Sequence, residues 1–128
     1  LSAPLDKIQI IKGWTENGKI NEVVYDVICS DDREINNRSN KCKETKASVN
    51  FENCSFDENY GSDRLEVIWT DTEYTPDQNT FYYARAIENP TCRWSTYDSI
   101  RIDEKPAKNY PKIMREMAWS SPIWVKNN

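Results

Sequence analysis

The segment that decides the fold is "TFYYARAIENPTCRWSTYD", residues Thr80–Asp98. Its first half, Thr80–Glu88, is crowded with aromatic residues and contains neither Gly nor Pro. Such a composition favours a β-strand. Because side chains alternate between the two faces of a strand, Phe81, Tyr83 and Ile87 are expected to share one face.

The second half of this segment leaves the strand at Pro90, because proline cannot donate to a sheet ladder. Ser95 and Asp98 then have the spacing of a helix-capping pair. The sequence therefore predicts a single helical turn that runs from this pair to Arg101.

Five further segments carry the β-branched or alternating residues that are typical of strands. They are Lys7–Trp14, Lys19–Cys29, Ala47–Phe56, Asp63–Asp71 and Ser120–Val125. Asn17 and Gly18 separate the first two and predict a tight hairpin. The segment Ser30–Lys46 is polar and without periodicity, so it is predicted to be a loop.

Near the C-terminus, Asn109 and Pro111 are placed to start a short helix with Ile113 and Met117 on its inner face. We expect one domain over residues 1–128. The predicted class is all-β, an immunoglobulin-like β-sandwich of about six to seven strands with one or two short helical turns near the C-terminus.

The composition restricts the function. With 17 basic and 21 acidic residues the net charge is −4, which disfavours a nucleic-acid-binding surface. No apolar run approaches the roughly 18 residues of a membrane-spanning helix, so no membrane span is expected. The sequence starts at Leu1 without a signal peptide, as expected for a processed product or a piece of a longer protein.

The chain has no histidine. This excludes Cys-His and Ser-His nucleophile pairs, and also zinc or iron sites built on histidine. We therefore expect no cofactor and no metal in this chain, and no catalysis by this chain alone.

Four cysteines, Cys29, Cys42, Cys54 and Cys92, are scattered without a C-x-x-C pair. The pattern is typical of two disulfides formed in an oxidising compartment, although four buried thiols would also fit it. The sequence leaves three pairings open. We favour Cys29–Cys42, which would close the polar loop between these residues, together with Cys54–Cys92.

One cysteine invites a catalytic interpretation. Cys92 with Arg93 and Arg101 resembles the nucleophile and phosphate-binding arginine of a cysteine phosphatase. However, Arg93 follows too soon and Arg101 too late for such a loop, and its glycines are missing. A half-cystine is the favoured interpretation of Cys92.

Two acidic groups could also suggest chemistry. The loop Asp57–Asp63 places Asp, Asn, Gly and Asp at alternate positions, as in calcium loops, but no Glu closes the site. Asp71, Glu73 and Asp77 offer carboxylates of the kind that glycoside hydrolases use. Because charged loops are usually just solvated, we favour polar turns in both places.

The tryptophans could stack on sugar rings, although most tryptophans of a β-sandwich anchor its core or an interface. They are Trp14, Trp69, Trp94, Trp119 and Trp124. An exposed row of them on one sheet face would favour a carbohydrate- or partner-binding module. Burial in the sandwich beside an exposed apolar patch at one edge would favour contact with another domain.

A set of ordered motifs resembles a known family. The motifs are "IQIIKGW" (residues 8–14), "VYDV" (24–27), "VIWTD" (67–71), "FYYARAIENPTCRWSTYDSIR" (81–101) and "MAWSSPIWV" (117–125). Together they resemble the C-terminal end of the bacterial family known as domain of unknown function 3604. The block from Thr80 to Arg101 and the ending Ala118–Val125 are its most specific parts.

The resemblance implies a longer protein. Full-length members look like proteins with an N-terminal metal-dependent phosphoesterase barrel of the polymerase-and-histidinol-phosphatase type, whose metals are held by histidines and carboxylates. None of those motifs occurs in this chain, so no catalytic or metal residue can be transferred to it. Many members look exported, which agrees with the predicted disulfides. Some members lack these cysteines and have Pro in place of Cys92, which argues against a nucleophilic role for this cysteine.

The family resemblance leads to a specific expectation. This chain would be a non-catalytic accessory domain that packs on the upstream barrel of an exported, periplasmic or extracellular, metallohydrolase-like protein. It could also line the cleft for a small anionic substrate. The residues expected to make the interdomain or ligand contact are Arg93, Trp94, Tyr97, Arg101, Trp119 and Trp124.

Overall fold

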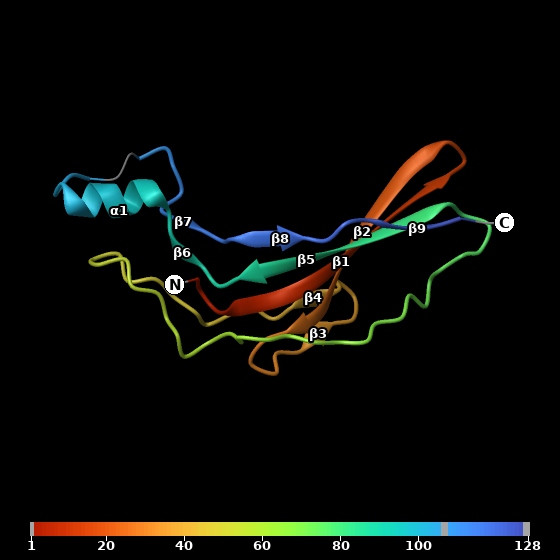
Figure 1. Ribbon diagram of the computed structural model, residues 1–128, viewed down its shortest axis with the longest axis horizontal. Helices are drawn as coiled ribbons and strands as arrows, with labels where there is room; N and C mark the ends of the chain where they lie inside the picture. Colours follow the sequence, from red (N-terminus) through yellow and green to blue (C-terminus); the bar gives the residue numbers. More distant parts are fainter. Residues whose placement is uncertain (1, 106–107, 127–128) are drawn as a thin grey trace.

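The computed structural model describes residues 2–105 and 108–126 and is mostly β (Figure 1). The strands of the described chain are β1 (Leu5–Glu16), β2 (Lys19–Cys29), β3 (Ile35–Asn36), β4 (Lys41–Cys42), β5 (Thr80–Glu88), β6 (Thr91–Cys92), β7 (Ile113–Met114), β8 (Met117–Trp119) and β9 (Ile123–Val125). One helix, α1 (Trp94–Arg101), follows β6.

The β1–β2 hairpin forms as predicted. Glu16 pairs with Lys19, so Asn17 and Gly18 make a two-residue turn. Their φ angles are 51° and 73°. Only a type I′ turn needs two residues in the left-handed region, and Asn-Gly supplies them at the lowest cost.

The main sheet has five strands in the order β2-β1-β5-β8, with β9 also paired to β5. β8 and β9 therefore share one edge of β5, at Arg85–Ile87 and Thr80–Tyr82 respectively. Ser120 bridges the gap between them. Its backbone N–H donates to the carbonyl of Ala84, and its hydroxyl accepts from the Ala84 N–H.

A long coil, residues 63–79, covers one face of this sheet. We call this face the inner face. Leu65 and Trp69 of the coil meet Ile10 and Ala84 around a shallow cavity. In contrast, Ile68 is 97% exposed. The side chains of residues 63–71 therefore alternate between sheet and solvent, as predicted. The prediction of a strand is wrong, because these side chains dock on the sheet while their backbone pairs with no neighbour beyond an isolated bridge at Ser62.

Three other local predictions are wrong. The predicted strand Ala47–Phe56 is a set of turns with one bridge between Val49 and Phe56. The predicted loop Ser30–Lys46 contains the small β3–β4 sheet. The predicted helix after Asn109 is instead β7, in which Ile113 pairs with Cys92. The first two segments are decided by local pairing, and the third by pairing with the distant Cys92.

The disulfides join Cys29 to Cys42 and Cys54 to Cys92, the favoured pairing. The first ties β4 to the end of β2. The second ties the turn-rich segment before the coil to the entrance of α1. Two disulfides are typical of proteins from an oxidising compartment.

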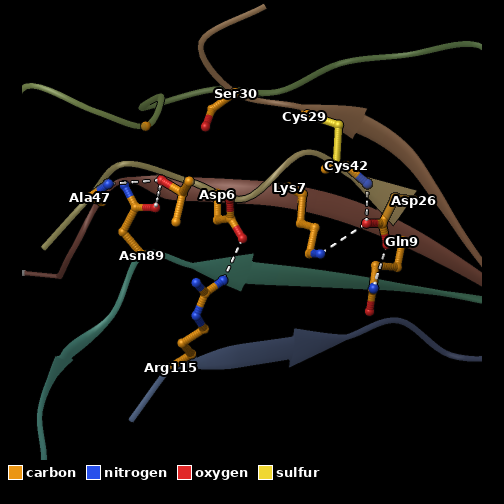
Figure 2. A network of polar contacts seen from close by, with 12 residues as sticks. Asp6, Lys7, Gln9, Asp26, Cys29, Ser30, Cys42, Ala47, Asn89 and Arg115 are labelled. Carbon is orange, nitrogen blue, oxygen red and sulfur yellow. Dashed lines mark hydrogen bonds and ion pairs between the residues drawn. A yellow bond between two sulfur atoms is a disulfide. The ribbon is translucent and has the colours of Figure 1, made fainter. Parts of the chain in front are cut away.

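Two buried carboxylates connect distant segments near the first disulfide (Figure 2). Asp6 is 1% exposed and forms ion pairs with two arginines. Arg33 follows β2, and Arg115 precedes β8. Asp26 accepts hydrogen bonds from Lys7 and Gln9 and from the backbone of Cys42. These bonds compensate the cost of burying the two charges.

The predicted fold class is confirmed: the protein is mostly β, with antiparallel sheets and one short helix, an arrangement consistent with a β-sandwich. Its immunoglobulin-like character stays a prediction.

Candidate functional site

Helix α1 exposes its large apolar residues and buries two of its polar ones. Thr96 and Ser99 are buried, whereas Trp94, Tyr97 and Ile100 are exposed. Residues three apart lie on the same side of a helix, so these three form a single stripe. A helix packed on its own domain shows the opposite pattern. The stripe of α1 is therefore an apolar surface that the described chain leaves exposed.

The stripe belongs to a larger surface, which we call the helix patch. The described chain has 15 exposed large apolar residues, and seven of them lie in or near α1. They are Phe51, Trp94, Tyr97, Ile100, Ile102, Tyr110 and Ile113. Contiguous exposed apolar surface of this kind marks interaction sites in soluble proteins.

The helix is bonded to its own domain from both sides. The buried Thr96 hydroxyl donates to the Lys112 carbonyl at 2.8 Å, and the tip of Tyr97, a residue of the exposed stripe, donates to the Cys54 carbonyl at 3.2 Å. The disulfide of Cys92 lies directly before the helix. The N-cap is Arg93 without a side-chain cap bond, so the predicted capping role of Ser95 is wrong, since Ser95 lies within the first turn.

Two arginines predicted as contact residues flank the stripe. Arg93 lies over the ring of Tyr110, 5.6 Å from its centroid. Arg101 is exposed at the other end of α1 and lies 3.5 Å from Asp98. Both guanidinium groups border the helix patch, where a partner could accept hydrogen bonds from them.

The remaining two predicted contact residues lie elsewhere. Trp119 is in β8, which lies near the middle of the molecule, and Trp124 is in β9, which lies towards the end opposite α1 (Figure 1). The six predicted residues thus form two groups, and only Arg93, Trp94, Tyr97 and Arg101 lie together.

Trp119 and Trp124 belong to the outer face of the main sheet. Trp124 is paired with Phe81 and Trp119 with Arg85, so all four side chains emerge on one side. Phe81 and Tyr83 are parallel within 7°, with centroids 6.4 Å apart, and Trp124 lies 5.0 Å from Phe81. We call these residues, with Trp119 and Arg85, the aromatic face.

A glycine makes this arrangement possible. Gly13 lies opposite Phe81 in the β1–β5 ladder. The Phe81 ring fills the space that a Cβ atom at position 13 would need. The ring therefore covers Gly13, as aromatic residues do at a cross-strand glycine.

Arg85 is oriented by a relay of hydrogen bonds. Its Nε and Nη2 donate to Gln9 Oε1 at 2.8 and 2.5 Å, and Gln9 Nε2 donates to Asp26 Oδ1 at 2.6 Å. Burial by itself would raise the pKa of Asp26. Hydrogen bonds from Lys7, Cys42 and Gln9 outweigh it, so the pKa is lowered and Asp26 stays ionised. The fixed amide of Gln9 then holds the guanidinium in place.

A second polar cluster lies on the inner face. Lys12 and Asp71 form an ion pair at 2.6 Å, with both side chains nearly buried. Tyr82 donates to Asp71 and Tyr25 donates to Glu73. Burial and these carboxylates raise the pKa of Tyr25 to about 12 and raise that of Tyr82 further.

This cluster holds the coil on the sheet. Burial alone would raise the pKa of Asp71, but bonds from Lys12, Tyr82 and the Glu73 backbone lower it instead. Trp69 is packed between Tyr25 and Tyr82, with centroids 5.1 and 6.3 Å apart. Asp71 and Glu73 are therefore bound to neighbouring side chains, which argues against an acid–base pair.

The other candidate groups have structural roles. Cys92 is a half-cystine, as favoured. In the loop Asp57–Asp63, the Asp57 carboxylate accepts from the backbone and side chain of Asn59, which makes a local turn. Across the described ranges, no group of three or more His, Cys, Asp or Glu side chains is placed to hold a metal ion. In the same ranges, no helix has the length and apolar character to cross a membrane.

Sequence reasoning missed the aromatic face as a site. The alternation of β5 did place Phe81 and Tyr83 on one side. However, the opposition of Gly13 and the relay through Gln9 depend on the β1–β5 and β1–β2 registers, which no short motif records.

Comparison with known proteins gives one match. A family described as "Protein of unknown function (DUF3604)" matches residues 1–127. No curated protein and no solved structure matches the chain.

Proposed function

Because the chain belongs to the DUF3604 family of proteins of unknown function, we propose that it is a non-catalytic accessory domain of a longer metallohydrolase-like protein. In this proposal the helix patch packs on an upstream phosphoesterase-type barrel of the same polypeptide. The chain stabilises that barrel, and the arginines beside the patch face the cleft for an anionic substrate.

The observation that carries the proposal is the inverted helix. Trp94 is 67% exposed although it begins the helix that the Cys54–Cys92 disulfide anchors. Leaving an apolar stripe in water while Thr96 and Ser99 are buried is unfavourable for an isolated domain. A covering domain would remove that penalty, and aromatic residues with arginines at the rim are typical of interface anchors.

The exposed area supports the same conclusion. The chain exposes 9444 Å², whereas a compact monomer of its 15.0 kDa exposes about 7,000 Å². The excess of about 2,400 Å² partly reflects the elongated outline of the chain (Figure 1). It is also of the size that an obligate interface removes from one partner, about 1,000–2,500 Å².

The proposed location follows from the two disulfides, which persist in oxidising compartments. We place the protein in the periplasm or outside the cell. A measurement of disulfide content in protein recovered from each fraction tests this placement. Recovery of the reduced chain from the cytoplasm would contradict it.

The docking role is tested with Trp94→Ala and Ile100→Ala in the full-length polypeptide. Each should weaken the domain contact by about 2 kcal/mol, as truncation of an interface anchor does. Differential scanning calorimetry should show earlier unfolding and greater independence of the two domains. In this chain alone Trp94→Ala should leave the urea midpoint nearly unchanged, because that side chain is 67% exposed.

Ile20→Ala is a matched control, since Ile20 is equally apolar and 84% exposed but lies in the β1–β2 hairpin. This substitution should change neither the unfolding of the full-length polypeptide nor that of this chain alone. Full-length variants that unfold like the wild type would contradict the docking role. Metal-dependent phosphoesterase turnover by this chain alone would contradict the non-catalytic role.

A further inference from the structure

The aromatic face has features that docking through α1 does not explain. It extends from β8, near the middle of the molecule, to β9, at the end away from the helix patch (Figure 1). Trp119 and Trp124 are 60% and 64% exposed there. Two large exposed indoles on the same side of an edge are costly in water, so a ligand that covers them would be stabilised.

The rings lie next to one another on this face. The Phe81 ring lies over Gly13, and Tyr83 is parallel to it within 7°. Trp124 adjoins Phe81 at an interplanar angle of 44°. Ring-shaped ligands suit such a surface, because the C–H groups of a sugar face pack on the electron-rich face of an aromatic ring. Peptides, in contrast, need pockets for alternate side chains.

Arg85 adds a charge to the aromatic face. Four arginines of the chain are half-buried: Arg33, Arg85, Arg93 and Arg115. Arg33 and Arg115 are paired with Asp6, and Arg93 lies over Tyr110. Within residues 2–105 and 108–126, Arg85 bonds instead to the neutral amide of Gln9 and to no carboxylate.

The remaining donors of Arg85 are therefore available to a ligand. Nε and one Nη2 hydrogen are engaged by Gln9, whereas Nη1 is bonded to no described residue. A guanidinium held in a fixed orientation loses little entropy on binding a carboxylate. The relay from Asp26 through Gln9 provides that fixed orientation, as supporting groups do at binding sites.

We propose that the aromatic face binds a saccharide carrying a single carboxylate, with its rings on Phe81, Tyr83 and the two tryptophans and its carboxylate on Arg85. A single charge fits better than a dense polyanion, because the face has one fixed, acid-free cation and the chain has a net charge of −4. This binding function uses different residues from the helix patch and does not depend on the docking role.

The test uses a xylo-oligosaccharide with one glucuronate branch as the probe. The unbranched xylo-oligosaccharide of equal length is the neutral control. Isothermal titration calorimetry and quenching of tryptophan fluorescence measure binding. We expect the branched probe to bind about tenfold or more tightly than the neutral one, as a charge-assisted hydrogen bond allows. Rising salt should reduce this difference.

Variants assign the site. Arg85→Gln should abolish the preference for the charged probe, and Trp119→Ala should weaken both probes without affecting the fold, since Trp119 is exposed. Arg38→Gln, an exposed arginine elsewhere, and Trp94→Ala in the helix patch are matched controls and should bind like the wild type.

Three outcomes would overturn the proposal. They are absence of binding at millimolar probe, equal binding by Arg85→Gln and the wild type, and tighter binding of a capped Leu-Glu-Leu peptide than of the branched saccharide. The last would identify an acidic protein partner instead. None of these outcomes bears on docking, since the variants for the helix patch are scored separately.

Discussion

Gly13 and Phe81 lie opposite each other in β1 and β5, and the Phe81 ring occupies the volume that any side chain at position 13 would fill. Among the described glycines, Gly18 and Gly61 have φ angles in the left-handed region, whereas Gly13 does not. The glycine is therefore needed for the ring above it and not for the backbone.

Gly13→Ala should destabilise the chain by about 1–3 kcal/mol, because the new methyl group forces the Phe81 ring off the sheet. Urea unfolding followed by far-ultraviolet circular dichroism measures this loss. In the Phe81→Ala background the same substitution should cost much less, since the overlapping ring is gone. Equal costs in both backgrounds would show that the glycine serves another purpose.

Asp26→Asn should reduce stability by about 1–3 kcal/mol at neutral pH, because three donors lose their charged acceptor. The folded-state pKa of Asp26 lies below its ordinary value of 3.8. Its contribution is therefore present above pH 3.8 and is lost as the pH falls through the lower, folded-state value. The wild type should lose stability in that acid range more steeply than the variant.

Denaturation at a series of pH values from neutral to strongly acidic measures this difference. Glu34→Gln is a control, because Glu34 pairs with Lys43 in a fully exposed position. Parallel pH profiles for the wild type and Asp26→Asn would contradict the role of the buried carboxylate.

The Cys54–Cys92 disulfide should contribute about 4 kcal/mol by the loop-entropy relation, and Cys29–Cys42 about 3 kcal/mol, because the first closes the longer loop. The sequence separations are 38 and 13 residues. Serine pairs at each bridge, compared by thermal unfolding, measure the order. Loss of Cys54–Cys92 should also speed proteolysis near α1, whereas loss of the other bridge should not.

Two tyrosines should lose their protons at a higher pH than an ordinary tyrosine. The pKa of Tyr25 is raised to about 12, and that of Tyr82 lies higher still, mainly through burial and then through Glu73 and Asp71. Both favour the neutral phenol, so their contribution to stability is present below pH 10.0 and is lost as the pH rises towards the folded-state values. Absorbance at alkaline pH should show this delay, and Tyr25→Phe should remove part of it. Titration of every tyrosine near its ordinary pKa would contradict the inner-face cluster.

The elements that depend on neighbouring residues were predicted well. The hairpin at Asn17–Gly18, the strand Thr80–Glu88, the last strand and the helical turn before Arg101 all follow from local turn chemistry and alternation. The favoured disulfide pairing, one of three that the sequence left open, was also correct.

The errors share a physical cause. Residues 63–71 alternate like a strand, but Trp69 and Asp71 dock on Tyr82 and Lys12 through side chains alone. The segment after Asn109 has helix-starting residues, but Ile113 pairs with Cys92, which the second disulfide fixes. Tertiary contacts between distant residues decided both segments, and one sequence does not encode them in a local pattern.

The structure brings together only some of the predicted contact residues. Arg93, Trp94, Tyr97 and Arg101 do gather around α1, because they are close in sequence. Trp119 and Trp124 do not join them, because the sheet topology carries β8 and β9 along the far edge of β5.

Hydroxyl-radical footprinting of the full-length polypeptide, compared with this chain alone, tests the docking role most directly. Trp94 and Tyr97 are exposed in this chain and should be oxidised rapidly in it. We expect strong protection of both in the full-length polypeptide, while the exposed Trp124 stays reactive in both samples. Equal oxidation of Trp94 and Tyr97 in the two samples would contradict the account, since no domain would then cover the helix patch.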